Sequence, residues 1–148
     1  MKIKTTLELL PGLVEMLPSK LESLSLIVMF KDVNNLDPVI KSVSKLTNLS
    51  YLSLFCHFYH YQDFQISPTS ILDLPSLTSF TLKYIRSEKL DLPKFLKIFP
   101  FPNNICKFIL RNDRTTEKDV ENIRSIVLKS GIQSFEYKML EQRHYYFY

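Results

Sequence analysis

Glycine and cysteine are both scarce in this 148-residue chain, and each scarcity excludes a class of site. Phosphate-cradling loops need several glycines where backbone amides approach the ligand. With only Gly12 and Gly131, the chain has neither a P-loop nor a dinucleotide-binding fingerprint, and we expect no cofactor. Cys56 and Cys106 are too few and too far apart for a disulfide framework, and neither belongs to a C-x-x-C pair. A reducing compartment, the cytoplasm or the nucleus, is therefore expected.

Long apolar runs are missing as well. The longest nearly apolar stretch, Leu24–Phe30, contains a serine and is far shorter than the ~20 residues that a membrane-spanning helix needs. Glu8 and Glu15 interrupt the segment that would have to be the apolar part of a signal peptide. The composition is that of a globular protein, with 45% hydrophobic residues, 23% charged residues and a net charge of +4. We expect one folding unit over residues 1–148, without secretion and without a membrane partner.

A repeated pattern, L-x-x-L-x-L, organises the chain. Its five copies are Leu21–Leu26, Leu49–Leu54, Leu77–Leu82, Ile105–Leu110 and Ile132–Tyr137, at spacings of 28, 28, 28 and 27 residues. An additional apolar residue precedes each copy by three or four positions: Leu17, Leu46, Leu74, Phe101 and Leu128. At a 45% hydrophobic background, chance fills all twenty positions with apolar residues about once in ten million trials. The L-x-L ends also do not fit the 3.6-residue spacing of an ordinary helical domain.

The segments between the copies have the patterns of helices or helical turns. Thr116 to Asp119 is a capping-box-like start, and Gly131 stands where a left-handed helix terminus needs glycine. The predicted inward faces are Val120, Ile123, Ile126 and Val127 in this helix, and Val39, Ile40, Val43 and Leu46 in a helix that opens at Asp37–Pro38. Two further helices are predicted to open at Ser67–Pro68 and Leu92–Pro93, and a first helix from about Thr5 to Met16, weakened by Pro11 and Gly12.

The strand-then-helix alternation and the L-x-x-L-x-L core resemble the leucine-rich-repeat family over nearly the whole chain. A 28-residue repeat is similar to the ribonuclease-inhibitor-like branch and to the repeat domains of F-box proteins. The resemblance implies an α/β solenoid of about five repeats, with short parallel strands on the concave face and helices on the convex face. We find no convincing F-box in the sequence, so the resemblance does not imply a role in a ubiquitin ligase.

One position departs from the family pattern. The asparagine or cysteine that follows the last leucine pair is replaced here by Met29, His57, Ile85, Asp113 and Leu140. The hydrogen-bonded ladder which that residue supplies is therefore missing, and irregular turns are expected after the strands. Terminal repeats also need a cover for their exposed core. We predict an N-terminal cap in residues 1–16 and a C-terminal aromatic cap in residues 139–148.

The sequence contains little that indicates catalysis or metal binding. His57, His60 and Asp63 are acceptable metal ligands, but an aromatic loop explains their spacing as well, and we expect no metal. Cys56 precedes His57 directly, but neighbours on a strand point to opposite faces and cannot form a nucleophile–base pair. We interpret Cys56 as a groove or turn residue, Cys106 as a small residue at a strand edge, and the chain as non-enzymatic.

The residues between the motif leucines are expected to face the groove, because side chains alternate across a strand. The predicted partner-binding residues are Ile27, Tyr51, Phe55, Lys83, Lys107, Arg111 and Lys138. The apolar half of this set supplies anchors and the basic half supplies orientation, which is typical of a protein-binding surface. We therefore expect a scaffold that recognises a partner protein with an acidic segment. A plain solvated sheet face explains the same residues equally well.

The alternative function is a nucleic-acid-binding module that uses the basic half of the same face. The basic charge favours it, and the terminal run of Tyr145, Tyr146, Phe147 and Tyr148 could stack on bases. Against it, 15 acidic residues dilute the charge and no RNA-binding motif accompanies it. Protein recognition therefore stays the primary prediction.

Overall fold

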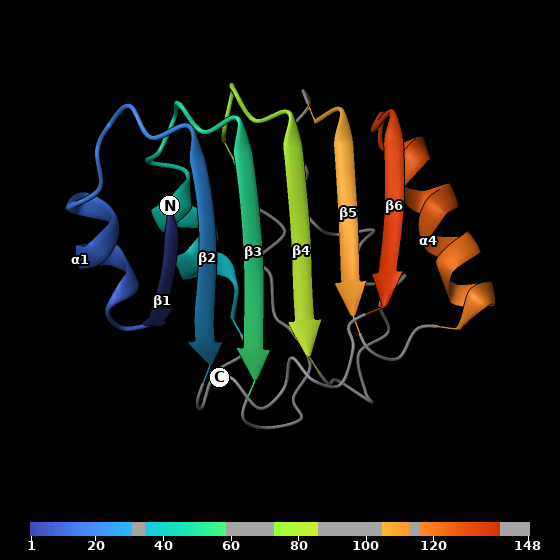
Figure 1. Ribbon diagram of the computed structural model, residues 1–148, viewed down its shortest axis with the longest axis horizontal. Helices are drawn as coiled ribbons and strands as arrows, with labels where there is room; N and C mark the ends of the chain where they lie inside the picture. The colour runs from blue at the N-terminus through green and yellow to red at the C-terminus, as the bar shows by residue number, and fades with distance from the viewer. Residues whose placement is uncertain (31–34, 59–72, 86–104, 113–115, 140–148) are drawn as a thin grey trace.

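The structure of the protein is a computed structural model that describes residues 1–30, 35–58, 73–85, 105–112 and 116–139. Several predicted features lie outside these residues: the helices opening at Ser67–Pro68 and Leu92–Pro93, the apolar Phe101, and the aromatic tail from residue 140 onward. Within them, the chain forms one sheet with helices beside it (Figure 1).

All strand pairs in the sheet are parallel, and the strands lie in the order in which they occur in the chain. The six strands are β1 (Lys2–Thr6), β2 (Ser23–Phe30), β3 (Tyr51–Phe58), β4 (Ser79–Ile85), β5 (Lys107–Asn112) and β6 (Ser134–Met139). The five predicted strands are β2 to β6, and their parallel arrangement is as predicted. The first strand was not predicted.

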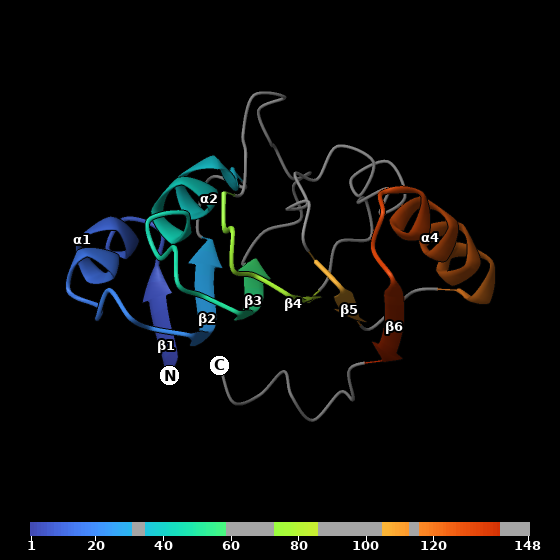
Figure 2. The same ribbon diagram turned by 90° about the horizontal axis from the view of Figure 1, so that it is seen from above.

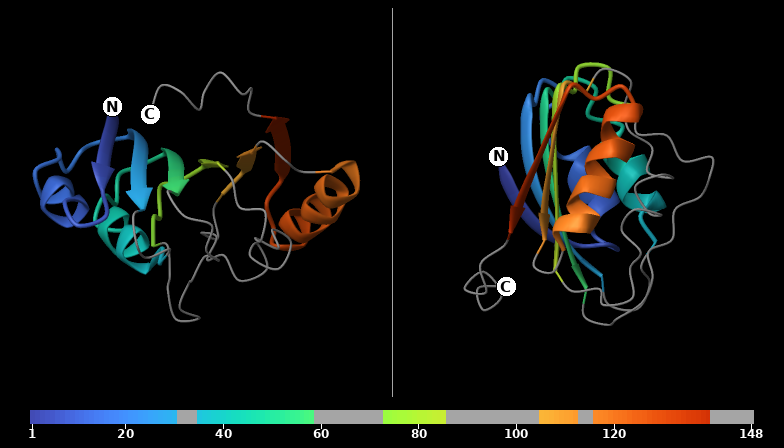
Figure 3. Two further views of the ribbon diagram at one scale, coloured as in Figure 1. Left: turned by 90° about the horizontal axis from the view of Figure 1, so that it is seen from below. Right: turned by 90° about the vertical axis from the view of Figure 1, so that its right-hand side faces the viewer.

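The described helices all lie on one side of the sheet. They are α1 (Leu10–Glu15), α2 (Asp37–Val43) and α4 (Glu117–Lys129). Seen from above, the strands follow a shallow arc with these helices on its outer side, and the two turned views agree (Figures 2 and 3). The α/β arrangement with helices on one face is therefore as expected, and the other face of the sheet lies on the inner side of the arc.

Both α2 and α4 begin where the sequence indicated, and α4 also ends there. Helix α2 ends at Val43, before Leu46, which had been predicted as part of its inward face. In α4, the Thr116 hydroxyl accepts a hydrogen bond from the Asp119 backbone N–H at 3.2 Å, which satisfies a donor that the first turn would otherwise leave unpaired. After the helix, Gly131 has a φ of 88°, in the left-handed region that favours glycine. In α2, Pro38 stands in the first turn, where its missing N–H has no helical partner to lose.

The prediction of a first helix over Thr5–Met16 is wrong in its first half. Lys2–Thr6 pairs with β2 as strand β1, and the helix is limited to Leu10–Glu15. The strand is favoured because it completes backbone bonding at the edge of β2: the Ser25 N–H donates to the Met1 carbonyl at 2.7 Å. Pro11 opens α1 instead of weakening its middle, because proline is tolerated in the first turn. The predicted cap over residues 1–16 is thus a strand followed by a short helix.

The strands continue past the positions where turns were expected, and the segments that follow β2, β3 and β4 lie outside the described residues. Met29, His57 and Ile85 all lie in strands and pair with one another in register. The reason is that the buried alternation continues past the motif: Val28, Phe30 and Cys56 are 0–1% exposed, so the extended backbone places further apolar side chains in the core. Asp113 and Leu140 lie outside the described residues.

A repeated set of backbone hydrogen bonds fixes the start of each strand. The Glu22 carbonyl accepts from the N–H groups of both Ser50 and Tyr51, at 2.8 and 3.1 Å. The same arrangement recurs 28 residues later, with Ser50 as acceptor, and again with Thr78 as acceptor. The residue that follows each shared acceptor is the first residue of a strand: Ser23, Tyr51 and Ser79. A ladder therefore exists at the beginning of the strands, whereas the family pattern places one after them.

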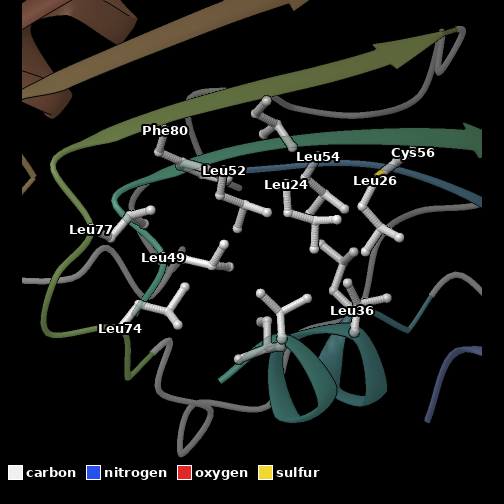
Figure 4. Packing of buried hydrophobic residues seen from close by; sticks show 14 of the residues in the cluster. Leu24, Leu26, Leu36, Leu49, Leu52, Leu54, Cys56, Leu74, Leu77 and Phe80 are labelled. Carbon is white, nitrogen blue, oxygen red and sulfur yellow. The ribbon is translucent and has the colours of Figure 1, made fainter. Parts of the chain in front are cut away.

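The central motif residues form a single buried column, as predicted. Leu24, Leu52, Phe80, Phe108 and Phe135 pair in register across β2 to β6. The first four are 0–1% exposed, and Phe135 is 8% exposed. The three aromatic rings stack with centroid distances of 5.6 Å and 5.9 Å. Figure 4 shows the first part of this column directed into the core with the leucines of the preceding turns.

Truncating this column should destabilise the protein strongly. Leu52→Ala removes a fully buried side chain, and we expect the free energy of unfolding to fall by about 2–5 kcal/mol. Leu128 offers a matched control, because it is 46% exposed on α4 although it occupies one of the repeated apolar positions. Leu128→Ala should change the free energy by no more than about 0.5 kcal/mol. Denaturant unfolding measures both, and equal losses would contradict the assigned core.

Candidate functional site

The sheet face away from α1, α2 and α4, here called the front face, carries three rows of side chains. The register of the strands gives the rows as Ser23, Tyr51, Ser79, Lys107 and Ser134; then Lys2, Ser25, Ser53, Thr81, Ile109 and Glu136; then Lys4, Ile27, Phe55, Lys83, Arg111 and Lys138. All seven predicted partner-binding residues stand in these rows. The columns expected from the motif are therefore confirmed as neighbours in the sheet.

Two members of the face, Lys2 and Lys4, were missed by the sequence prediction. They stand on β1, in a segment whose second half was predicted to be helical. The alternation of Lys2, Ile3 and Lys4 was the available signal, because it places both ammonium groups on one side of an extended chain and leaves Ile3 packed against the core. With Lys4 at one end and Lys138 at the other, both ends of the third row are basic, and Lys2 stands at the end of the second row.

Ile27 and Phe55 were predicted as exposed contact residues, and the structure corrects this. They are only 3% and 6% exposed, although they point away from the helices. They are direct cross-strand neighbours on two interior strands, and each has another side chain on its other flank. The His57 ring also lies edge-on to Phe55 at 6.4 Å. A position on the front face therefore does not guarantee exposure.

The other five predicted residues remain accessible. Tyr51 is 37% exposed, Lys107 and Lys138 are exposed, and Lys83 and Arg111 are half-buried. Tyr51 and Lys107 share the first row with Ser79 between them. These five residues thus combine one exposed aromatic ring with four cations, and Lys2 and Lys4 add two more exposed cations on β1.

Glu136 forms ion pairs with two of those cations. Its carboxylate lies 3.4 Å from the Lys107 ammonium and 3.0 Å from the Lys138 ammonium. The hydrogen bond from Lys138 holds the pKa of Glu136 below its ordinary value, and Lys107 adds to the effect. Lys107 and Lys138 therefore face solvent as members of a shared ion-pair group.

Lys83 and Arg111 have no such compensation. In the described part of the chain, no carboxylate lies within ion-pair distance of either residue. Burial lowers the pKa of Lys83, and the positive charges of Arg111 and then Lys2 lower it further. The pKa of His57 is likewise lowered, by burial and then by the charge of Lys4. Charges on β1 thus act on groups two and three strands away.

The structure also places several of the residues that were considered as catalytic or metal-binding candidates. Cys56 is not a groove or turn residue but is fully buried in the core, and burial raises the pKa of its thiol far above the ordinary value. A thiol held protonated is a poor nucleophile. Cys106 is exposed just before β5. No group of three potential metal ligands occurs among the described residues, while His60 and Asp63 lie outside them.

A cavity of about 470 Å³ lies on the helix side, between α1 and α2. Its lining consists of Pro11, Asn35, Asp37, Pro38, Lys41, Ser42 and Lys45. Among the described residues, the lining includes no histidine or cysteine, so it lacks the Ser–His and Cys–His pairs that are common in acyl transfer. The front face is therefore the better candidate for a functional site.

Comparison with models of known protein families, with curated proteins and with solved structures finds no match to this chain. Within the described ranges, none of the helices has the length and apolar character that crossing a membrane requires.

The two thiols should differ sharply in reactivity. We expect a maleimide to label Cys106 within minutes in the native protein and to leave Cys56 unmodified, because Cys106 is exposed to the reagent whereas Cys56 is buried and its thiol is held protonated by a raised pKa. Intact-mass measurement should give one adduct in native conditions and two in denaturant. Cys106→Ser should abolish the native adduct, whereas rapid labelling that persists in this variant would place Cys56 at the surface.

Proposed function

We propose that this chain is a leucine-rich-repeat solenoid that recognises a partner protein through its front face. The architecture supports the proposal in three ways: the strands are parallel and sequential, their starts share a backbone ladder with a 28-residue period, and the described helices lie on the opposite side. A sheet in which every strand is hydrogen-bonded to its neighbours is a rigid support for side chains that must hold fixed positions.

The observation that carries the proposal is the combination of an exposed tyrosine with uncompensated cations on one accessible surface. Tyr51 can be buried by a partner, and aromatic residues of this kind are frequent energetic centres of protein interfaces. Lys83 and Arg111 lie two rows further along the strands and attract an acidic partner. Phe55 and Ile27 support this surface from below as packed residues, and Tyr51 takes the anchoring role first expected of Phe55.

Nucleic-acid binding is the second candidate, favoured by the surplus of positive charge from Lys2, Lys83 and Arg111. Sequence-independent binding of single strands needs a series of exposed aromatic faces on which bases stack. In the described rows, Tyr51 is the exposed aromatic residue and Phe55 is buried. The surface therefore fits a protein partner better.

The test compares two truncations of similar exposure on opposite sides of the sheet. Full-length protein captures its partner from an extract of the cells that produce it, and the affinity of the purified partner is then measured. We expect Tyr51→Ala to weaken binding at least about tenfold, because loss of a buried anchor commonly exceeds 1.4 kcal/mol. Leu128→Ala, exposed on α4, should leave the affinity within about twofold. Equal affinities for both variants would move the binding site off the front face.

Salt dependence distinguishes the second candidate. A nucleic-acid partner predicts binding to short oligonucleotides whose log affinity falls steeply with log salt, and each removed cation should lower the slope by about one unit for duplex DNA. A protein partner predicts no measurable oligonucleotide binding at low salt.

A further inference from the structure

Lys83 and Arg111 form an arrangement that is unfavourable unless an anion occupies it. They are direct cross-strand neighbours on β4 and β5, so their backbones are about 5 Å apart and both side chains leave the same face. Like charges directly opposite each other destabilise a strand pair. Both side chains are half-buried, which weakens the screening by water. Burial is the main cause that lowers the pKa of Lys83, and the positive charge of Arg111 lowers it further.

Two other cations on the same face do have a counter-charge. The neighbouring cations Lys107 and Lys138 share the carboxylate of Glu136 at 3.4 and 3.0 Å. Arg111 on β5 and Lys83 on β4 receive no carboxylate within the described residues. Within the basic half of the third row, the charge without a counter-charge therefore lies on Lys83 and Arg111 and not on Lys138.

Two hydrogen-bonding groups beside these charges are also unsatisfied. The Thr81 hydroxyl is buried without a hydrogen-bond partner, and Thr81 precedes Lys83 by two positions on the same face. The Nε atom of Arg111 is likewise buried without an acceptor. Thr81 is short and lies close to the sheet, whereas the Lys83 and Arg111 side chains keep accessible surface. Donors at two depths therefore occupy neighbouring positions of one face, and no acceptor for the Thr81 hydroxyl or the Arg111 Nε is found among the residues that the structure describes.

We infer that Thr81, Lys83 and Arg111 bind a phosphate ester group carried by a side chain of the partner protein. The inference rests on the proposed function, because it assigns the chemistry of the group that the front face recognises. A phosphate monoester is a dianion near neutral pH and neutralises both cations, whereas a carboxylate neutralises one. Its several oxygens can accept from an ammonium, a guanidinium and a hydroxyl at once, and the guanidinium fork matches phosphate geometry.

The experiment uses the full-length protein with N-acetyl-O-phosphoserine amide as probe. The matched probes are N-acetylserine amide, N-acetylaspartate amide and orthophosphate, all at constant ionic strength. Backbone amide NMR shifts report where each probe binds. We expect the phosphoserine probe to shift the amides of Thr81, Lys83 and Arg111 and to bind at least about tenfold more tightly than the aspartate probe, as expected when a second charge-assisted bond forms. It should bind at least as tightly as orthophosphate.

Substitutions distinguish a built site from general basic charge. Lys83→Met and Arg111→Met should each weaken binding of the phosphoserine probe about tenfold or more. Lys129→Met removes the same charge from an exposed position at the end of α4, on the opposite side of the sheet, and should change the affinity less than about twofold. Lys83→Met should not lower the unfolding temperature, because it removes a repulsion, so its lost binding is not a folding defect. Equal losses from Lys83→Met and Lys129→Met would overturn the site.

Other outcomes also decide the assignment. Tighter binding of orthophosphate than of the phosphoserine probe by tenfold would assign the site to free phosphate and overturn it as a partner contact. Tighter binding of an oligonucleotide without terminal phosphates would assign it to phosphodiesters and equally overturn it. The inference and the proposed function fail separately. If the phosphoserine probe does not bind but Tyr51→Ala still loses partner binding, only the phosphate inference is wrong. If the phosphoserine probe binds but Tyr51→Ala keeps its affinity for the partner, the proposed recognition through the front face is wrong.

Discussion

The backbone carbonyls that each accept two N–H groups from the next strand start are the constraint on which the rest of this structure depends. Glu22, Ser50 and Thr78 supply them at intervals of 28 residues. Because side chains alternate along a strand, a shift of one residue at any start would exchange the two faces of that strand. The register set at the strand starts therefore places the leucines and phenylalanines in one core column. The same register places Lys83 beside Arg111 on the other face.

Much of the core could be predicted from the sequence, because a periodic apolar pattern records burial directly. The column from Leu24 to Phe135 and the caps at Thr116 and Gly131 follow from local patterns that the structure bears out. The strand at Lys2–Thr6 escaped prediction, because its pairing with β2 is a tertiary contact. The sequence also did not predict that β2 and β3 continue through Met29 and His57, because the length of these strands depends on the burial of Phe30 and Cys56.

The front face shows where such prediction ends. Alternation identified which residues occupy it, but not which of them stay accessible. Ile27 and Phe55 became packed residues, while Tyr51 remained exposed. The electrostatics also depend on three-dimensional distance: the charge of Lys2 acts on Lys83 across intervening strands, and Glu136 reaches two lysines on different strands. None of these relations has a signature at fixed sequence spacing.

The nearly constant offset between paired strands has a kinetic consequence. The paired residues are separated by 28 positions at three of the junctions, by 27 at the last and by 23 at the first. Loop-closure entropy varies only with the logarithm of loop length, so these differences change the closure cost by well under about 1 kcal/mol. Chain entropy therefore does not select where folding begins. Side-chain packing is then the remaining influence, and we expect a folding nucleus in the second half of the sheet, where the rings of Phe80, Phe108 and Phe135 stack.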